Sequence, residues 1–551
     1  MIRNTRVIKK TPSAYSYPLL IKHLLHFPAR YTPEKEIVYR DKVRYDYREL
    51  MRRINRLASG LSAIGVGPGD VVAVLDWDSH RYLECYFAVP MLGAVLHTVN
   101  IRLAPSQMLY TMKHAEDVVV LVHEDFLPVV EGIKDELKTV RKWVLLKDGE
   151  TMPDTSVPIN VEYERLLESS SDRYEFDDFD EDSMATLFYT TGTTGLPKGV
   201  YFSHRQLLLH TMMMVAILGA YDAQGRFRSK DVYMPLTPMF HVHAWGLPYV
   251  ATLLGVKQVY PGRYEPETVL HLVEKENVTF SHCVPTILHM LLQSPAAKNV
   301  DLNHWKLLVG GSVLLRGLAK AAMERGIDIY TGYGMSETCP VLSLALLKPD
   351  NLDADLDHQL RVRTSTGFPV PFVDLRVVDP NMNEVPHDGR TPGEIIVRAP
   401  WLTQGYHGNP EASEMLWSDG YLHTGDVAQV DPDGYIRITD RLKDVIKSGG
   451  EWISSLEIES VISEHPAVGE AAVVGRPDER WGERPVALVI PAGEVKDGRL
   501  KAELHEFLKN AAAQGRISKW AVPDDILVVE TIPKTSVGKI DKKLIRQETI
   551  A

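Results

Sequence analysis

A loop near the middle of the chain combines the residue types that bind phosphate. Residues 189–199 read YTTGTTGLPKG and follow an apolar run that predicts a buried strand. Gly192 and Gly195 permit backbone turns that a side chain would block, while the threonine hydroxyls and Lys198 supply hydrogen-bond donors and a positive charge. The loop differs from the P-loop of nucleotide hydrolases, because proline precedes the lysine and glycine follows it. A flexible Thr/Gly loop is the alternative interpretation.

Glu337 is a candidate ligand for a metal ion. It lies in the segment 333–338, YGMSET, where a carboxylate stands beside hydroxyl side chains, and oxygen ligands of this kind suit Mg²⁺. The segment follows a predicted strand, as do loop 189–199 and the turn at 310–312. Ligands of open parallel sheets bind beyond the carboxyl ends of the strands, so we expect the three turns to meet at one crevice. Taken alone, Glu337 is more typical of an ordinary loop residue.

Two further motifs lie in the second half of the chain. Asp426 ends the segment 421–426, YLHTGD, and a carboxylate of this kind can accept two hydrogen bonds from a vicinal diol such as ribose. Lys539 ends the segment 533–539, PKTSVGK, where a positive charge can stabilise negative charge that develops during a reaction. A turn aspartate and a solvated basic tail are the respective alternatives.

The elements that must position these residues alternate between strand and helix. Apolar runs at 71–75, 118–122, 184–188, 257–260, 278–280, 307–309 and 327–330 predict strands, and 50–63 and 82–92 predict helices. This alternation favours an α/β fold with a mostly parallel sheet covered on both faces. After residue 373, short β-like runs predict a small antiparallel β subdomain. We therefore expect a large N-terminal domain, residues 1–440, and a small C-terminal α+β domain, residues 441–551.

Composition narrows the class of protein. The 551 residues carry a net charge of −12, which does not favour a nucleic-acid partner. Three widely spaced cysteines indicate a reducing compartment, and no apolar run predicts a membrane span, so we expect a cytoplasmic protein. The segment before Glu34 holds basic but no acidic residues, which leaves organelle targeting open. An opening amphipathic helix is predicted at 15–25.

These motifs, in this order along about 15–545, resemble the adenylate-forming family of acyl-CoA synthetases, peptide-synthetase adenylation domains and firefly luciferase. The resemblance implies a large domain of layered αβ subdomains and a small mobile C-terminal domain that turns at a hinge near Lys443. It also implies activation of a carboxylic acid by MgATP to acyl-AMP, followed by transfer to CoA. Medium- to long-chain fatty acyl-CoA synthetases resemble the chain most, which implies a fatty acid as substrate, a homodimer and at most peripheral membrane contact.

The resemblance also implies roles for individual residues. Catalysis falls to Lys539, Glu337 and Ser336, and Mg²⁺ binding to Glu337 and Thr190. The implied nucleotide site comprises Thr190, Thr191, Gly192, Thr193, Thr194, Lys198, Gly311, Thr331, Gly332, Tyr333, Ser336, Asp426, Arg441, Lys443 and Trp452. The implied acyl pocket comprises His241, Val242, Trp245, Gly311 and Gly332, with Trp245 in the place of a gate residue. Lys447, Gly449 and Gly450 are implied to face CoA.

Several alternatives stay open. A metal pair at His241 and His243 lacks an evident third ligand, and core packing is the alternative for Trp245. An amino-acid adenylating enzyme would place an aspartate in the pocket motif, where this chain has Phe240 and His241. An aryl- or branched-acid–CoA ligase, a luciferase-like oxygenase and a non-catalytic AMP-binding protein are the other candidates.

Overall fold

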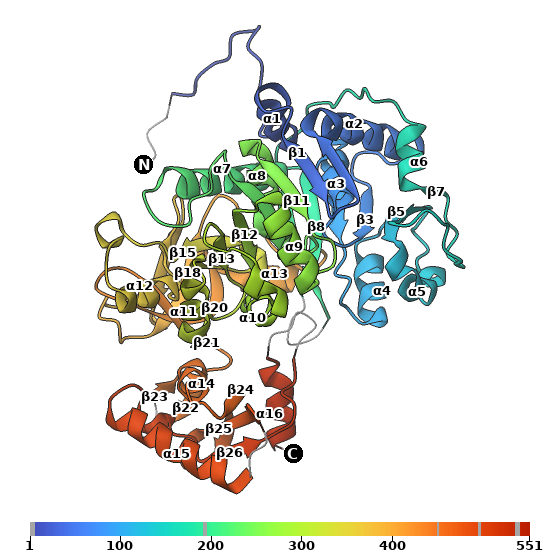
Figure 1. The fold of residues 1–551 in the computed structure, drawn as a ribbon. Coiled ribbons are helices and arrows are strands. Elements are labelled where there is room, and N and C mark those ends of the chain that lie inside the picture. Colours follow the sequence, from blue (N-terminus) through green and yellow to red (C-terminus); the bar gives the residue numbers. More distant parts are fainter. Residues whose placement is uncertain (1–5, 191–195, 449–450, 494–496, 535–539, 551) are drawn as a thin grey trace.

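The computed structural model describes residues 6–190, 196–448, 451–493, 497–534 and 540–550. Its α/β architecture confirms the predicted fold class: two large, mostly parallel sheets, a small antiparallel sheet and a separate C-terminal unit (Figure 1). The helices are α1 (His26–Tyr31), α2 (Tyr47–Ala63), α3 (His80–Met91), α4 (Pro105–His114), α5 (Leu127–Glu131), α6 (Tyr163–Glu168), α7 (His204–Ala220), α8 (Leu247–Leu254), α9 (Pro266–Glu276), α10 (Pro285–Gln293), α11 (Arg316–Glu324), α12 (Leu356–Arg363), α13 (Pro410–Leu416), α14 (Ser455–Ser463), α15 (Asp497–Ala513) and α16 (Lys542–Ile550).

The first sheet has seven strands in the order β7-β6-β5-β3-β4-β8-β9. All neighbours are parallel except β8 and β9, which pair antiparallel and flank the phosphate-loop motif. Apolar side chains on both faces explain its burial, as expected for parallel strands. The strands are β3 (Val71–Leu75), β4 (Val95–Thr98), β5 (Val119–His123), β6 (Lys142–Leu146), β7 (Val161–Glu162), β8 (Met184–Thr190) and β9 (Lys198–Ser203).

The second sheet has nine strands in the order β16-β15-β14-β13-β12-β10-β11-β1-β2. Its middle strands are parallel, and antiparallel pairs form both edges. The carboxyl ends of β10, β12, β13 and β14 therefore meet at one edge. The strands are β1 (Glu36–Tyr39), β2 (Val43–Asp46), β10 (Val232–Leu236), β11 (Lys257–Tyr260), β12 (Phe280–Cys283), β13 (Lys306–Val309), β14 (Asp328–Gly334), β15 (Val341–Leu344) and β16 (Phe368–Pro369).

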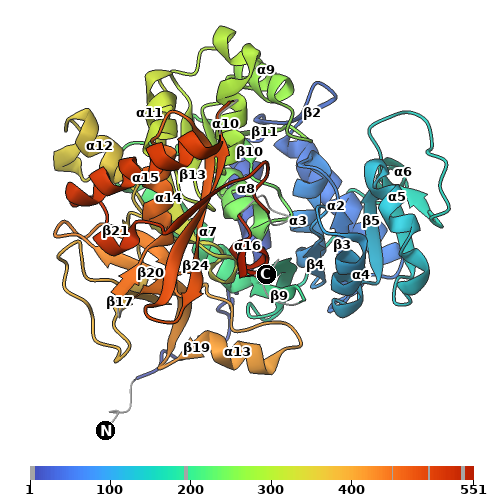
Figure 2. The same ribbon diagram turned by 90° about the horizontal axis from the view of Figure 1, so that it is seen from below.

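Two smaller sheets complete the fold. The antiparallel strands β17 (Asp374–Val378), β18 (Gly393–Arg398), β19 (Trp417–Ser418), β20 (Tyr421–Val430) and β21 (Ile436–Arg441) form the predicted β subdomain. The C-terminal sheet contains β22 (Ile446–Ser448), β23 (Glu451–Ile453), β24 (Val468–Asp478), β25 (Gly482–Pro491) and β26 (Asp525–Val528). With α14–α16 it lies below the rest of the chain (Figure 1), and in the view from below it lies nearest the viewer, with the seven-stranded sheet off to the right (Figure 2).

Two expectations about the described elements were wrong in detail. The segment 15–25 is not one amphipathic helix, since only Ile21–Leu25 forms a 3-10 helix before α1. Pro18 explains this, because proline disfavours helical geometry in the residue that precedes it. The strand predicted at 278–280 lies at Phe280–Cys283 instead. No helix among the described residues has the length and apolar character needed to cross a membrane.

Candidate active site

Glu337 and Lys198 meet at the side chain of Tyr406. Glu337 lies on the 3-10 helix η6 (Ser336–Thr338), just beyond β14, and is 7% exposed. The Tyr406 hydroxyl donates to Glu337 Oε1 at 2.7 Å, and Lys198 Nζ lies 4.6 Å from the centre of the Tyr406 ring. Burial raises the pKa of Glu337, which the hydrogen bond from Tyr406 and the charge of Lys198 oppose. The fold thus brings the phosphate loop's lysine to the candidate metal ligand.

Asp426 forms a second cluster with Tyr333 and Arg441. The Tyr333 hydroxyl donates to Asp426 Oδ2 at 2.7 Å, and Arg441 Nε lies 3.4 Å from Asp426 Oδ1. Asp426 and Arg441 face each other across the β20–β21 pair, which fixes their distance. The positive charge of Arg441 also acts on Glu337. The two clusters are therefore neighbours, and together they join motifs from four parts of the sequence.

The other residues predicted to bind the nucleotide make different contacts. Thr190 ends β8 opposite Lys198, and its hydroxyl oxygen lies 3.5 Å from the Lys198 carbonyl oxygen. The Thr331 hydroxyl donates to backbone carbonyls of Arg363 and Ser365, which fastens β14 to the end of α12 and to the residues just after it. Ser336 is half-buried beside Glu337. Thr191, Gly192, Thr193, Thr194, Gly449, Gly450 and Lys539 lie outside the described residues.

The segment after β21 connects the large domain to the C-terminal sheet. Lys443 is exposed in this connector, between β21 and β22. Lys447 is exposed on β22, and its backbone N–H donates to Glu483 Oε2 at 2.9 Å. Trp452 lies opposite Lys447 in the β22–β23 register. Lys443 and Lys447 therefore lie within a few residues of the boundary between the sheets.

The predicted acyl-pocket motif forms a left-handed turn. Val242, His243, Ala244 and Trp245 have φ values of 41°, 58°, 47° and 58°, although none is glycine. Left-handed backbone costs an L-residue about 1–2 kcal/mol, so neighbouring contacts must hold the turn. His241, just before it, is half-buried, whereas Val242 is buried.

Three buried polar side chains fasten the backbone that enters this turn. Asp78 accepts a hydrogen bond from the Met239 N–H at 2.8 Å, and the Tyr86 hydroxyl donates to the Met239 carbonyl. Thr98 Oγ1 donates to the Phe240 carbonyl at 3.0 Å. Asp78 lies between β3 and α3, Tyr86 on α3 and Thr98 on β4, so the seven-stranded sheet and its helix determine the position of the turn.

The turn places Trp245 over the glycine pair that follows β13. Trp245 is 6% exposed, and a Cβ at Gly310 would lie 3.1 Å from the end of its indole ring. Gly311 has φ +79°, a backbone conformation that favours glycine. Gly332, which has no side chain, packs against Leu308. The glycines thus create the space that the indole fills, which agrees with either a pocket wall or core packing.

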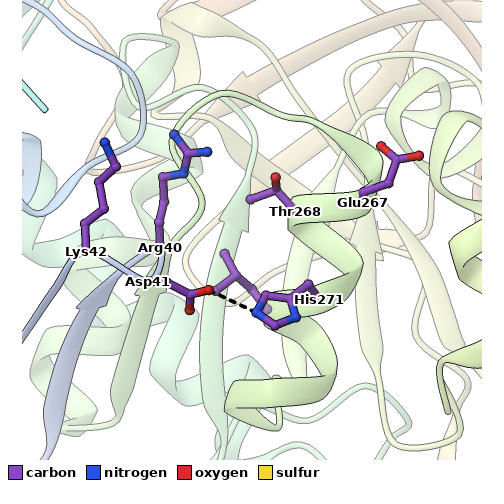
Figure 3. Close-up of a pocket in the computed structure, with 7 residues that line it drawn as sticks. Arg40, Asp41, Lys42, Glu267, Thr268 and His271 are labelled. Atoms are coloured by element: carbon purple, nitrogen blue, oxygen red, sulfur yellow. Dashed lines mark hydrogen bonds and ion pairs between the residues drawn. The ribbon is translucent and has the colours of Figure 1, made fainter. Parts of the chain in front are cut away.

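A surface pocket of ≈ 350 Å³ lies elsewhere, at the start of α9. Figure 3 shows Asp41 and His271 pointing toward one another across it, 3.1 Å apart. Arg40 lies 4.0 Å from Glu265 and Lys42 lies 3.5 Å from Asp148, so the cations around this pocket have acidic neighbours. It contains none of the predicted site residues and is not assigned a role.

Sequence reasoning missed Tyr406. The residue lies in a loop between Gly405 and Gly408, where no periodic pattern marks a buried side chain. Only the contacts to Glu337 and Lys198 reveal its place in the site.

Comparisons with known proteins identify the family to which the chain belongs. The model of the family described as AMP-binding enzyme matches residues 26–407, and that of the AMP-binding enzyme C-terminal domain matches residues 457–539. The chain belongs to the AMP-binding enzyme family. The predicted resemblance to the adenylate-forming enzymes is thereby confirmed.

Curated relatives and solved structures match over almost the whole chain. The long-chain-fatty-acid–CoA ligase of Thermus thermophilus is 43% identical, covering 93% of this chain and 92% of that protein. The medium-chain-fatty-acid–CoA ligase of Ectopseudomonas oleovorans is 34% identical, covering 96% of each. The crystal structure of ATP-bound MatB from Rhodopseudomonas palustris is 26% identical with a TM-score of 0.80, covering 96% of this chain and 98% of that one.

Proposed function

We propose that the protein is a fatty acyl-CoA synthetase that activates a medium- to long-chain carboxylic acid. The protein is an AMP-forming acid–CoA ligase. The observation that carries the proposal is the pair of adjacent clusters, Glu337 with Tyr406 and Lys198, and Asp426 with Tyr333 and Arg441. The first suits phosphate and a cation, the second suits a ribose diol. The names of the two curated relatives support an aliphatic acid.

The first half-reaction joins the acid to AMP. A carboxylate oxygen of the acid attacks the α-phosphorus of ATP, a new oxygen–phosphorus bond forms, and pyrophosphate leaves. Asp426 and Tyr333 orient the ribose, while Lys198, Arg441 and Lys539 stabilise the negative charge that gathers on the phosphates. Positioning and electrostatic stabilisation of this kind account for most catalysis at phosphorus.

The residues around Glu337 fit a bound Mg²⁺. Glu337 is a buried carboxylate, and burial raises its pKa, so a nearby dication would compensate a charge that is costly to bury. Thr190 supplies a second oxygen at the end of β8. Glu337 and Thr190 would hold the ion, and the bound ion would supply positive charge at the phosphates.

The second half-reaction transfers the acyl group to CoA. The thiol sulfur attacks the acyl carbon of the mixed anhydride, the carbon–oxygen bond to AMP breaks, and the thiol proton is released. We propose that the C-terminal domain turns at Lys443 between the two steps, which removes Lys539 and brings Lys447, Gly449, Gly450 and Trp452 toward the site. Trp245, on its left-handed turn, would gate the acyl pocket.

Replacing Lys443 by proline should slow thioester formation selectively. Proline fixes φ and therefore restricts the rotation that the connector must make. We expect at least a tenfold loss in the thioester step, measured from supplied acyl-AMP and CoA, with little change in pyrophosphate release. Lys443→Ala, which keeps φ free, is the matched control. Equal losses in both half-reactions would contradict the hinge assignment.

Replacing Tyr406 by phenylalanine should move the acid limb of the pH–rate profile for adenylation to higher pH. Burial raises the pKa of Glu337, whereas the hydrogen bond from the Tyr406 hydroxyl lowers it. Loss of that hydrogen bond, which stabilises the charged carboxylate, therefore raises the pKa of Glu337 further. Because the carboxyl is protonated below its pKa, the variant should lose activity at a pH where the wild type is still active.

The measurement is kcat/KM for adenylation between pH 5 and 9. Tyr421→Phe is the control, since the Tyr421 hydroxyl donates to Asp374 instead of Glu337. Superimposable profiles for the wild type and Tyr406→Phe would contradict a role for Glu337 as an ionised ligand.

The class of acid is tested by ATP–pyrophosphate exchange. Octanoate and palmitate should support exchange, whereas benzoate and phenylalanine should not. Exchange with benzoate alone would move the proposal to an aryl acid, and exchange with phenylalanine alone to an amino-acid adenylating enzyme.

A further inference from the structure

His282 presents an unsatisfied nitrogen beside the candidate gate residue. It lies on β12 and is fully buried, with its ring centre 5.1 Å from that of Trp245. Nε2 shares a hydrogen bond with the Tyr233 hydroxyl at 2.8 Å. Nδ1 has no hydrogen-bond partner among the residues that the structure describes.

The absence of a hydrogen-bond partner at His282 Nδ1 among the described residues requires an explanation. Nearly all buried polar atoms are hydrogen-bonded, and one that is not costs about 1–3 kcal/mol. Burial lowers the pKa of His282 to about 3, so the imidazole is neutral at physiological pH. With Nε2 bound to Tyr233, Nδ1 offers either one N–H or one lone pair, depending on the tautomer. A hydroxyl group satisfies both cases, because it donates as well as accepts.

The position of His282 on the sheet indicates what reaches it. Side chains alternate along a strand, so His282 and Phe280 share one face of β12, while Ser281 and Cys283 share the other. Trp245 lies on the face of His282 and covers Gly310 at the carboxyl edge of the same sheet. An acyl chain that enters past Trp245 along this face would come to His282, because the two ring centres lie only 5.1 Å apart.

Aromatic side chains close the same face beyond His282. Phe280 stacks on Phe227 with ring centres 4.3 Å apart, and Phe227 in turn lies against Tyr233. The Tyr330 hydroxyl donates to the Gly225 carbonyl at 3.1 Å, which fastens the neighbouring chain over β14. No protein group among the described residues pairs with Nδ1, so a polar group on the substrate can be its partner.

We propose that the preferred acid carries a hydroxyl group on the part of its chain that passes Trp245, and that His282 Nδ1 recognises this group. The inference rests on the proposed function and narrows its substrate to hydroxy-substituted medium-chain fatty acids. Sites that hydrogen-bond a substrate hydroxyl reject the analogue without it, because the protein group is then left unpaired. His282 is thus a specificity-determining residue that takes no part in the chemical step.

The test compares octanoate with hydroxyoctanoates substituted at carbons 3 to 7, by kcat/KM for CoA-dependent AMP formation. The wild type should prefer at least one hydroxy acid by about tenfold or more. His282→Leu should remove this preference through a higher KM for the hydroxy acid. His282→Asn keeps a polar atom near the position of Nδ1 and should restore most of it.

The outcomes separate this inference from the proposed function. If the wild type turns over octanoate as well as it turns over every hydroxy isomer, the proposed role of His282 is overturned. The assignment of the protein as a synthetase would stand. A preference that survives in His282→Leu would overturn the role of His282 as well. Failure to turn over any acid of either series would contradict the proposed function itself. If His282→Leu does not fold, the wild type and His282→Asn still decide.

Discussion

Lys539→Ala should lose adenylation almost completely. The lysine ends the motif PKTSVGK, and its charge would stabilise the oxygens between the attacking carboxylate and the α-phosphate. Removing one group that stabilises charge in a transition state costs about 10²–10³-fold in rate. We expect a loss of at least this size in acid-dependent pyrophosphate release. Thioester formation from supplied acyl-AMP should continue, because the proposed role of the lysine is confined to the first half-reaction.

Lys543→Ala is the matched control for this prediction. Lys543 is exposed on α16, four residues farther along the same basic segment, and its loss should change neither half-reaction measurably. Equal adenylation by Lys539→Ala and the wild type would show that Lys539 belongs to a solvated tail. Equal loss of both half-reactions would indicate damage to the C-terminal domain.

The second large effect is expected at Glu337. Glu337→Gln has nearly the same shape and still accepts the hydrogen bond from Tyr406, but it carries no negative charge for a cation. We expect kcat for adenylation to fall about 10²–10³-fold, and the Mg²⁺ concentration for half-maximal activity to rise. Titration of adenylation with Mg²⁺ at saturating ATP measures both quantities.

Glu414→Gln provides the control for removal of one carboxylate. Glu414 is exposed on α13, so its replacement should leave the Mg²⁺ dependence unchanged. An unchanged Mg²⁺ dependence in Glu337→Gln, even with a lower rate, would contradict metal binding at Glu337 and leave it a structural partner of Tyr406.

Apolar runs made much of the fold predictable. The strand expected at 257–260 matches β11 residue for residue, and the helix expected at 50–63 is the body of α2. Such elements are predictable because burial imposes an unbroken or periodic apolar pattern. The helix predicted at 15–25 was wrong because the spacing of apolar residues takes no account of Pro18. The order of strands within each sheet depends on contacts between distant segments and had no local signal.

The site was predictable where motifs carry it and not elsewhere. Glu337, Asp426 and Lys198 stand in recognisable segments, and the structure shows which side chains join them. Tyr406 and His282 were not predicted from the sequence because neither lies in a motif. The left-handed turn at Val242–Trp245 contains no glycine, so its sequence predicts ordinary backbone. Contacts from the β3–α3 segment, α3 and β4 impose that geometry, and only the folded chain reveals them.

The central claim, an ATP-dependent fatty acid–CoA ligase, is tested most directly by product analysis. The protein is incubated with MgATP and straight-chain acids of increasing length, with and without CoA, and AMP and acyl-CoA are quantified. We predict strong AMP formation only when both acid and CoA are present, equimolar acyl-CoA, and a maximum at one chain length in the medium to long range. AMP or pyrophosphate formation that ignores CoA, with no thioester product for any acid, would contradict the claim.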